Sequence, residues 1–194
     1  MRKFAASLAG AVLLTGVTPT AGHACGYENP AAVATGALNL SFPDALHVGT
    51  AVWQAQVDGL LPRTDASAQA GSAMAQQAAL WDVMRLLDRL RAQLEAANDS
   101  AQSASPHPTL ATVFLSSVLW TRFASSEGRV AAQMHASGPD TDDVVIVTEP
   151  LVLRALVERR LDATVAIERG LMRLYGESSQ VAAARRWLIH MGAT

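Results

Sequence analysis

The chain has 194 residues, of which 50% are hydrophobic, so it is long enough to form one domain with a sizeable core. Its 15 basic residues stand against 17 acidic ones, and its only lysine is Lys3. This composition excludes a strongly basic nucleic-acid-binding surface, and it excludes Schiff-base chemistry anywhere after position 3.

The first 24 residues have the pattern of a secretory signal peptide. Arg2 and Lys3 form a positive start, the stretch from Phe4 to Val17 is apolar, and small residues surround Ala24. The apolar stretch is shorter than the ~20 residues that span a bilayer. Later apolar runs are interrupted by charged residues or glutamine, so we expect no transmembrane segment in the mature chain. The sequence therefore predicts a periplasmic or secreted protein.

Cys25 is the only cysteine and would be the first residue after cleavage. An acylated cysteine occupies that position in lipoproteins, so Cys25 is a candidate for lipidation and for membrane tethering. The preceding residues, Gly22-His23-Ala24, lack the leucine that is typical of a lipobox, and a free thiol is the alternative. A single cysteine can form no intramolecular disulfide.

Residues 25–97 are predicted to be a helical N-terminal region with an irregular beginning. Ser41 is expected to cap a helix that runs to Val57, with Pro43 in its first turn. A longer helix is predicted over 73–96. The apolar stripes of these two helices follow helical spacing and comprise Leu46, Thr50, Trp53 and Val57 in the first, and Leu80, Val83, Met84, Leu87, Leu90 and Leu94 in the second. The four tryptophans are each expected to anchor an element in the core.

A polar, proline-containing stretch at 98–108 is predicted to be a linker to a C-terminal domain at 109–194. The strands predicted there cover 109–123, 129–136 and 144–148, with turn signals between them that favour an antiparallel meander. Helices are predicted at 150–158, 162–169 and 178–190, with a short strand at 171–175. The predicted fold class is α+β: an N-terminal helical segment followed by a small antiparallel sheet packed with helices.

The segment from Asp143 to Leu188 carries a spaced pattern of apolar residues and glycines. A β-branched strand ends at Thr148, a short leucine-containing helix follows, and a Leu-Asp step at Leu161 precedes Ala166 and Gly170. This order resembles the latter half of the sterol-carrier-like lipid-transfer family. The resemblance implies an apolar tunnel between sheet and helices that accepts a lipid-like molecule without covalent chemistry.

The chain departs from that family before the Leu-Asp step, where Arg159 and Arg160 replace the usual glycine. If the resemblance holds, the chain is not an enzyme, needs no cofactor, and binds an apolar small molecule or lipid. The residues expected to line the pocket are Val113, Leu115, Met134, Val145, Leu156 and Leu171. A filled core explains the apolar alternation on the strands more simply.

Two other functions remain open. An accessory protein of another secreted enzyme would use residues 25–62 as its docking surface. A metal-binding periplasmic protein would use Cys25 and His47, although no two histidines have a metal-ligand spacing. The sequence contains no nucleophile elbow, dinucleotide-binding fingerprint or P-loop, so no motif points to an enzyme.

Overall fold

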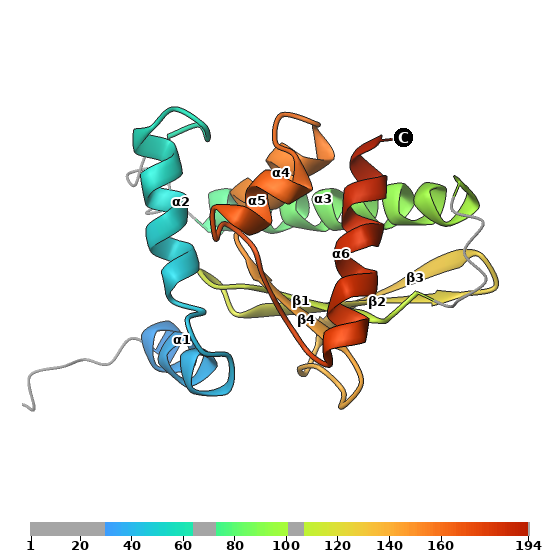
Figure 1. The fold of residues 1–194 in the computed structure, drawn as a ribbon. Coiled ribbons are helices and arrows are strands. Elements are labelled where there is room, and N and C mark those ends of the chain that lie inside the picture. The colour runs from blue at the N-terminus through green and yellow to red at the C-terminus, as the bar shows by residue number, and fades with distance from the viewer. Residues whose placement is uncertain (1–29, 64–72, 101–106, 194) are drawn as a thin grey trace, which may run out of the picture.

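The computed structural model describes residues 30–63, 73–100 and 107–193, and Figure 1 shows their arrangement. The predicted signal peptide and Cys25 lie outside these ranges. Within them the protein is α+β. Its elements are α1 (Pro30–Ser41), α2 (His47–Val57), α3 (Ala73–Ser100), β1 (Leu110–Phe114), β2 (Leu119–Ser126), β3 (Arg129–Ala136), β4 (Val144–Thr148), α4 (Pro150–Val157), α5 (Ala163–Glu168), β5 (Arg173–Tyr175) and α6 (Ser178–Ala193).

The first two helices differ from their prediction. Ser41 is the last residue of α1 and does not cap α2, which begins only at His47. Between them the chain turns sharply, with Asp44 at φ 66°. The buried residues of α2 are Val48, Val52 and Ala55, whereas the predicted stripe lies on the opposite side. Within the described ranges, no helix is long and apolar enough to cross a membrane.

The C-terminal half of α3 carries the buried part of its predicted stripe. Leu87, Leu90 and Leu94 are at most 2% exposed, while Leu80, near the start of the helix, is 45% exposed. The helix contacts β3, α4 and α6. The indole N–H of Trp187 on α6 donates to the Leu94 carbonyl at 3.1 Å, which joins the two helices across the core.

The sheet has five strands in the order β3-β2-β1-β4-β5. Antiparallel pairs join β1 to β2, β2 to β3 and β4 to β5, but β1 and β4 run parallel. The prediction of an antiparallel sheet is therefore correct for three of the four pairings and wrong for the pairing of β1 with β4. The connection from β1 to β4 contains β2 and β3, which belong to the same sheet.

The predicted strand 109–123 is two strands. The chain leaves β1 after Phe114 and turns back, with Val118 donating its N–H to the Phe114 carbonyl at 2.7 Å. Val118 has φ 49°, a left-handed conformation that β-branched residues rarely adopt. Because this turn contains no glycine, proline or asparagine, its sequence continues the strand pattern on both sides.

Most of the helices pack on one face of the sheet, and α1 lies toward the other (Figure 1). The strand register places Trp120 and Tyr175 on the same face as Val113 and Val145. Phe42, in the turn after α1, contacts both aromatic rings, with centroids 6.0 Å from Trp120 and 5.3 Å from Tyr175. The turn between α1 and α2 thus covers part of the second face.

The C-terminal helices agree closely with their predicted positions. α4 begins at Pro150, where a missing backbone N–H costs nothing. α5 is capped by Asp162, whose side chain accepts a hydrogen bond from the Thr164 amide. These two short helices and α6 enclose the core together with α3.

Candidate functional site

The six residues predicted to line a ligand pocket all belong to the hydrophobic core cluster or contact it. Leu115, Val145 and Leu156 are 3–6% exposed, Val113 and Leu171 are fully buried, and Met134 is partly buried.

They do not converge on one surface. Val113 and Val145 share one face of the sheet, and the register of Met134 with Thr121 places it on the other. Their joint role as a pocket stays a prediction.

Two of these residues lie next to α2. A Cβ atom on Gly49 would lie 3.4 Å from Cδ2 of Leu115, so the helix approaches that leucine closely because Gly49 has no side chain. Leu171 lines a hollow of about 270 Å³ together with Ala51 and Ala55. We call this hollow the α2 groove. Three small residues of α2 thus lie close to Leu115 or Leu171, beside the buried Val48 and Val52.

Polar residues form the rim of the α2 groove. They are Gln54, Asp58 and Arg169, and an ion pair of 3.9 Å joins Arg169 to Asp58 across it. Sequence reasoning missed these residues. The signal that was available is the spacing of Gly49, Ala51 and Ala55, three small residues in one helix.

The opposite face of α2 is apolar and exposed to solvent. Trp53 is 61% exposed, Val57 48% and Leu46 41%. These three residues belong to the stripe that the sequence indicated, and we call them the outer stripe. Trp81 on α3 is also 60% exposed, so neither tryptophan anchors its helix in the core, whereas Trp187 does.

The residues proposed for a metal site are not brought together by the described part of the chain. His47 is exposed and lies 3.5 Å from Asp44, a pair within one turn. Cys25 lies outside the described residues, so its pairing with His47 stays a prediction. Among the residues that the structure describes, no group of three or more histidine, cysteine, aspartate or glutamate side chains could hold a metal ion.

Glu149 and His107 are among the titratable groups with perturbed pKa values. Burial raises the pKa of Glu149, which lies between β4 and α4, and a hydrogen bond of 2.6 Å from the Ser116 hydroxyl partly offsets that effect. Burial and the neighbouring His190 lower the pKa of His107, whose ring stacks on Trp187 at 4.5 Å. Neither group lines the α2 groove.

A partly buried cluster of ion pairs lies on the face of the sheet that carries Trp120. Arg122 on β2 donates to both carboxylate oxygens of Asp143, at 2.7 and 3.0 Å, and also pairs with Asp140 at 2.6 Å. The Asp140 amide donates to Asp143 as well. Both carboxylate oxygens of Asp143 are used within this cluster, so it fixes the turn before β4.

No protein-family model matches the chain, and a comparison with curated proteins finds no match. Among solved structures, the chain is similar to Sterol Carrier Protein 2 Like 2 from Aedes aegypti. The palmitated form matches at 16% identity and a TM-score of 0.41, over 53% of this chain and 90% of that one. The crystal structure of the same protein matches at 16% identity and a TM-score of 0.38, over 54% and 97%.

The chain is also similar to the stereoselective inverting sec-alkylsulfatase Pisa1 from Pseudomonas sp., at 21% identity and a TM-score of 0.35. That match covers 42% of this chain and only 12% of the sulfatase. The likeness to the sterol carrier proteins is a weak, fold-level one. Because every TM-score is below 0.5, the chain is assigned to neither family.

Proposed function

We propose that this chain is an exported, non-enzymatic protein that binds an apolar, lipid-like ligand beneath α2. The observation that carries the proposal is the hollow that Ala51 and Ala55 of α2 line together with the buried Leu171, next to the close approach of Gly49 to Leu115. Ligand pockets in proteins commonly measure about 300–1,000 Å³. The α2 groove, at about 270 Å³, is smaller than this range, so a lipid chain would enter only if α2 moved outward.

Polar contacts join both ends of α2 to other parts of the described chain. Near its start, the Tyr175 hydroxyl donates to the Pro43 carbonyl at 2.7 Å and Arg173 lies 3.6 Å from Asp44. At its other end stands the exposed pair of Arg169 and Asp58. Exposed ion pairs contribute only about 0–1 kcal/mol each, so these two pairs hold α2 weakly. α2 therefore has the properties of a cover.

A reversible disulfide tests this directly. A Cβ atom on Gly170 would lie 3.9 Å from the Cβ of Ala51, within the range of about 3.5–4.5 Å that disulfides require. The test protein carries Ala51→Cys and Gly170→Cys, with Cys25→Ser to remove the native thiol. After delipidation, the reduced protein should bind a fluorescent fatty acid saturably, and the oxidised protein should not.

The comparison of two redox states of one chain provides the control. Gly170 has φ 70°, so any side chain there is strained, but the strain is the same in both states. The Cys25→Ser parent, treated with the same oxidant, must keep its binding. Equal uptake of the fatty acid by the oxidised and the reduced double-cysteine protein would show that the ligand does not enter beneath α2. If neither the parent nor the reduced protein binds the fatty acid saturably, ligand binding itself is refuted.

Export and the state of Cys25 are part of the same proposal. The predicted leader supports a periplasmic or secreted location, either free or tethered through an acylated Cys25. Mass spectrometry of the mature N-terminus distinguishes these forms, because acylation and cleavage each change the mass of the first peptide. A mature chain that still begins at Met1 would contradict export by this leader.

One observation favours a second function, that of an accessory protein that docks on a secreted partner. The outer stripe of α2 leaves Trp53 and Val57 in solvent, and large exposed apolar residues of this kind are common at interaction sites. Trp53→Gln with Val57→Ser should abolish capture of a partner from periplasm and leave fatty-acid binding intact. If this variant loses fatty-acid binding but still captures the partner, the result favours the ligand function and rejects docking through this stripe.

A further inference from the structure

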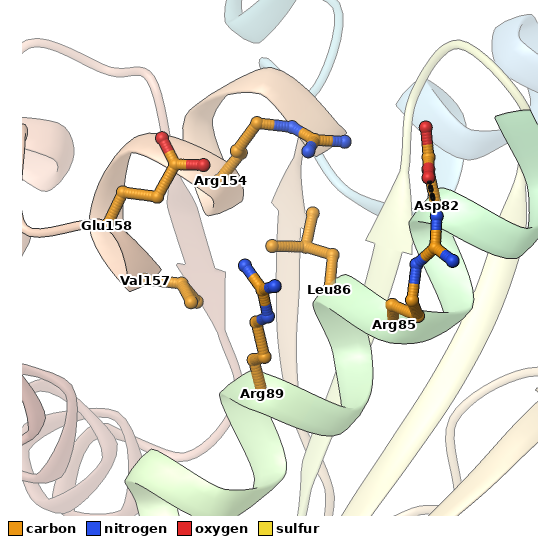
Figure 2. A pocket seen from close by; sticks show the side chains of 7 residues that line it. All are labelled: Asp82, Arg85, Leu86, Arg89, Arg154, Val157 and Glu158. Carbon is orange, nitrogen blue, oxygen red and sulfur yellow. Dashed lines mark hydrogen bonds and ion pairs between the residues drawn. The ribbon is translucent and has the colours of Figure 1, made fainter.

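A second hollow, of about 360 Å³, lies between α3 and α4 and is shown in Figure 2. We call it the α3–α4 groove. Its floor is apolar, because Leu86 and Val157 are only 4% and 7% exposed. The side-chain amide of Gln93 donates to the Val157 carbonyl at 2.9 Å, one turn beyond the groove on α3. This bond fixes the end of α4 against α3 and so holds the two walls at a set separation.

The two carboxylates of the groove are already neutralised. Asp82 forms an ion pair with Arg85, three residues further along the same helix, and Figure 2 shows this contact. Glu158 accepts hydrogen bonds from Arg160, whose Nε lies 2.9 Å from the carboxylate. Arg160 does not line the groove. Neither carboxylate therefore has its charge free for another cation.

Two guanidinium groups remain. Arg89 rises from α3 and Arg154 extends from α4 over the same hollow (Figure 2). Within the ranges that the structure describes, neither has a hydrogen bond or ion pair to a carboxylate. Arg154 is half-buried, so its charge is partly removed from water. The groove thus concentrates two uncompensated positive charges in a chain whose acidic residues outnumber its basic ones.

We propose that Arg89 and Arg154 bind a phosphate monoester. Guanidinium groups match phosphate oxygens in geometry and form charge-assisted, often bidentate hydrogen bonds with them. A phosphate monoester carries about −1.5 to −2 charge at neutral pH, which complements two free guanidinium groups better than a singly charged carboxylate does. The apolar floor accommodates the carbon atoms next to the phosphate. This site is separate from the α2 groove and does not depend on the ligand proposed there.

The phosphate can belong to a free small molecule or to a lipid headgroup, and two probes distinguish these sources. Calorimetric titration of the mature chain with phenyl phosphate reports the free form. Co-sedimentation with phosphatidylcholine vesicles that contain phosphatidic acid reports the lipid form, with pure phosphatidylcholine vesicles as the blank. The variants are Arg89→Gln and Arg154→Gln. Arg186→Gln is the matched control, since it removes an equal charge from an exposed site on α6.

Each groove variant should weaken binding of at least one probe about tenfold or more, the loss typical of a hydrogen bond to a charged group, while Arg186→Gln should change it less than twofold. Binding of phenyl phosphate identifies a free phosphorylated ligand, and binding only to the phosphatidic acid vesicles identifies a lipid headgroup. The proposal is overturned if neither probe binds, or if Arg186→Gln weakens binding as much as the groove variants do. Circular dichroism spectra of all three variants should match the wild type, because Arg89 and Arg186 are exposed and Arg154 is only half-buried.

Discussion

Phe42 is the residue whose removal should best reveal how firmly the turn between α1 and α2 is attached to the sheet. Truncating a fully buried phenylalanine to alanine costs about 3–5 kcal/mol. Phe42 is only partly buried, so we expect roughly half of that, about 2 kcal/mol, for Phe42→Ala. Its two tilted ring contacts, with Trp120 and Tyr175, would account for about 1 kcal/mol or more of this.

The assay is urea unfolding followed by circular dichroism, with the slope of the transition compared between variants. Leu40→Ala is the control, because Leu40 is 87% exposed and its loss should change the free energy of unfolding by less than about 0.5 kcal/mol. If Phe42→Ala is as stable as Leu40→Ala, the aromatic contacts do not hold this turn to the sheet. In that case the second face of the sheet has another cover.

Three further predictions concern backbone conformation and pH. Gly59 has φ 75° and open space around it, so Gly59→Ala should lower the free energy of unfolding by about 1 kcal/mol through backbone strain. Gly36 lies within α1 with open space around it, so Gly36→Ala should raise the free energy of unfolding by about 0.5–1 kcal/mol, because alanine favours the helix. The folded-state pKa of His107 is lowered, so the unfolded state binds more protons and wild-type stability should rise with pH up to about the ordinary value of 6.5. In His107→Phe, urea midpoints should lack this rise. The folded-state pKa of Glu149 is raised, so ionisation of this carboxyl should lower the stability of the wild type as pH rises above 4.5. Glu149→Gln should therefore be more stable than the wild type at neutral pH, and this difference should disappear in acid.

The C-terminal helices were predictable because local signals mark them. Pro150 and Asp162 stand at the starts of α4 and α5, where a helix favours such residues. The turn at Val118 was not predictable, because a β-branched residue in a left-handed conformation looks like part of a strand. The parallel pairing of β1 with β4 has no local signal either, since it depends on contacts between distant segments.

The orientation of α2 shows a limit of periodicity. Leu46, Trp53 and Val57 have helical spacing, but so do Val48 and Val52 on the opposite side. Periodicity predicts that such a helix is amphipathic or apolar all round, and cannot tell which face the domain covers. The domain covers the side with the smaller residues, since these permit close approach to Leu115.

The ion pairs within α3 follow from sequence spacing, but a site shared with another helix does not. Arg85 pairs with Asp82, and Arg91 pairs with Asp88 and Glu95, as their spacing along the helix indicates. Arg89 has no such partner in the described part of the chain, and its neighbour across the groove, Arg154, comes from a helix far along the chain. A site built from two elements in this way becomes visible only when the fold brings them together.

The hydrogen bond between Trp187 and the Leu94 carbonyl has a consequence for cooperativity. It ties the last helix to a helix that precedes the whole sheet, and both residues lie in one core. Neither helix can leave without exposing the other, so the fluorescence of a buried Trp187 and the helical signal of α3 should disappear at the same denaturant concentration. A chain divided after α3 would leave each fragment with an incomplete core, and refolding should then require both fragments in the same solution.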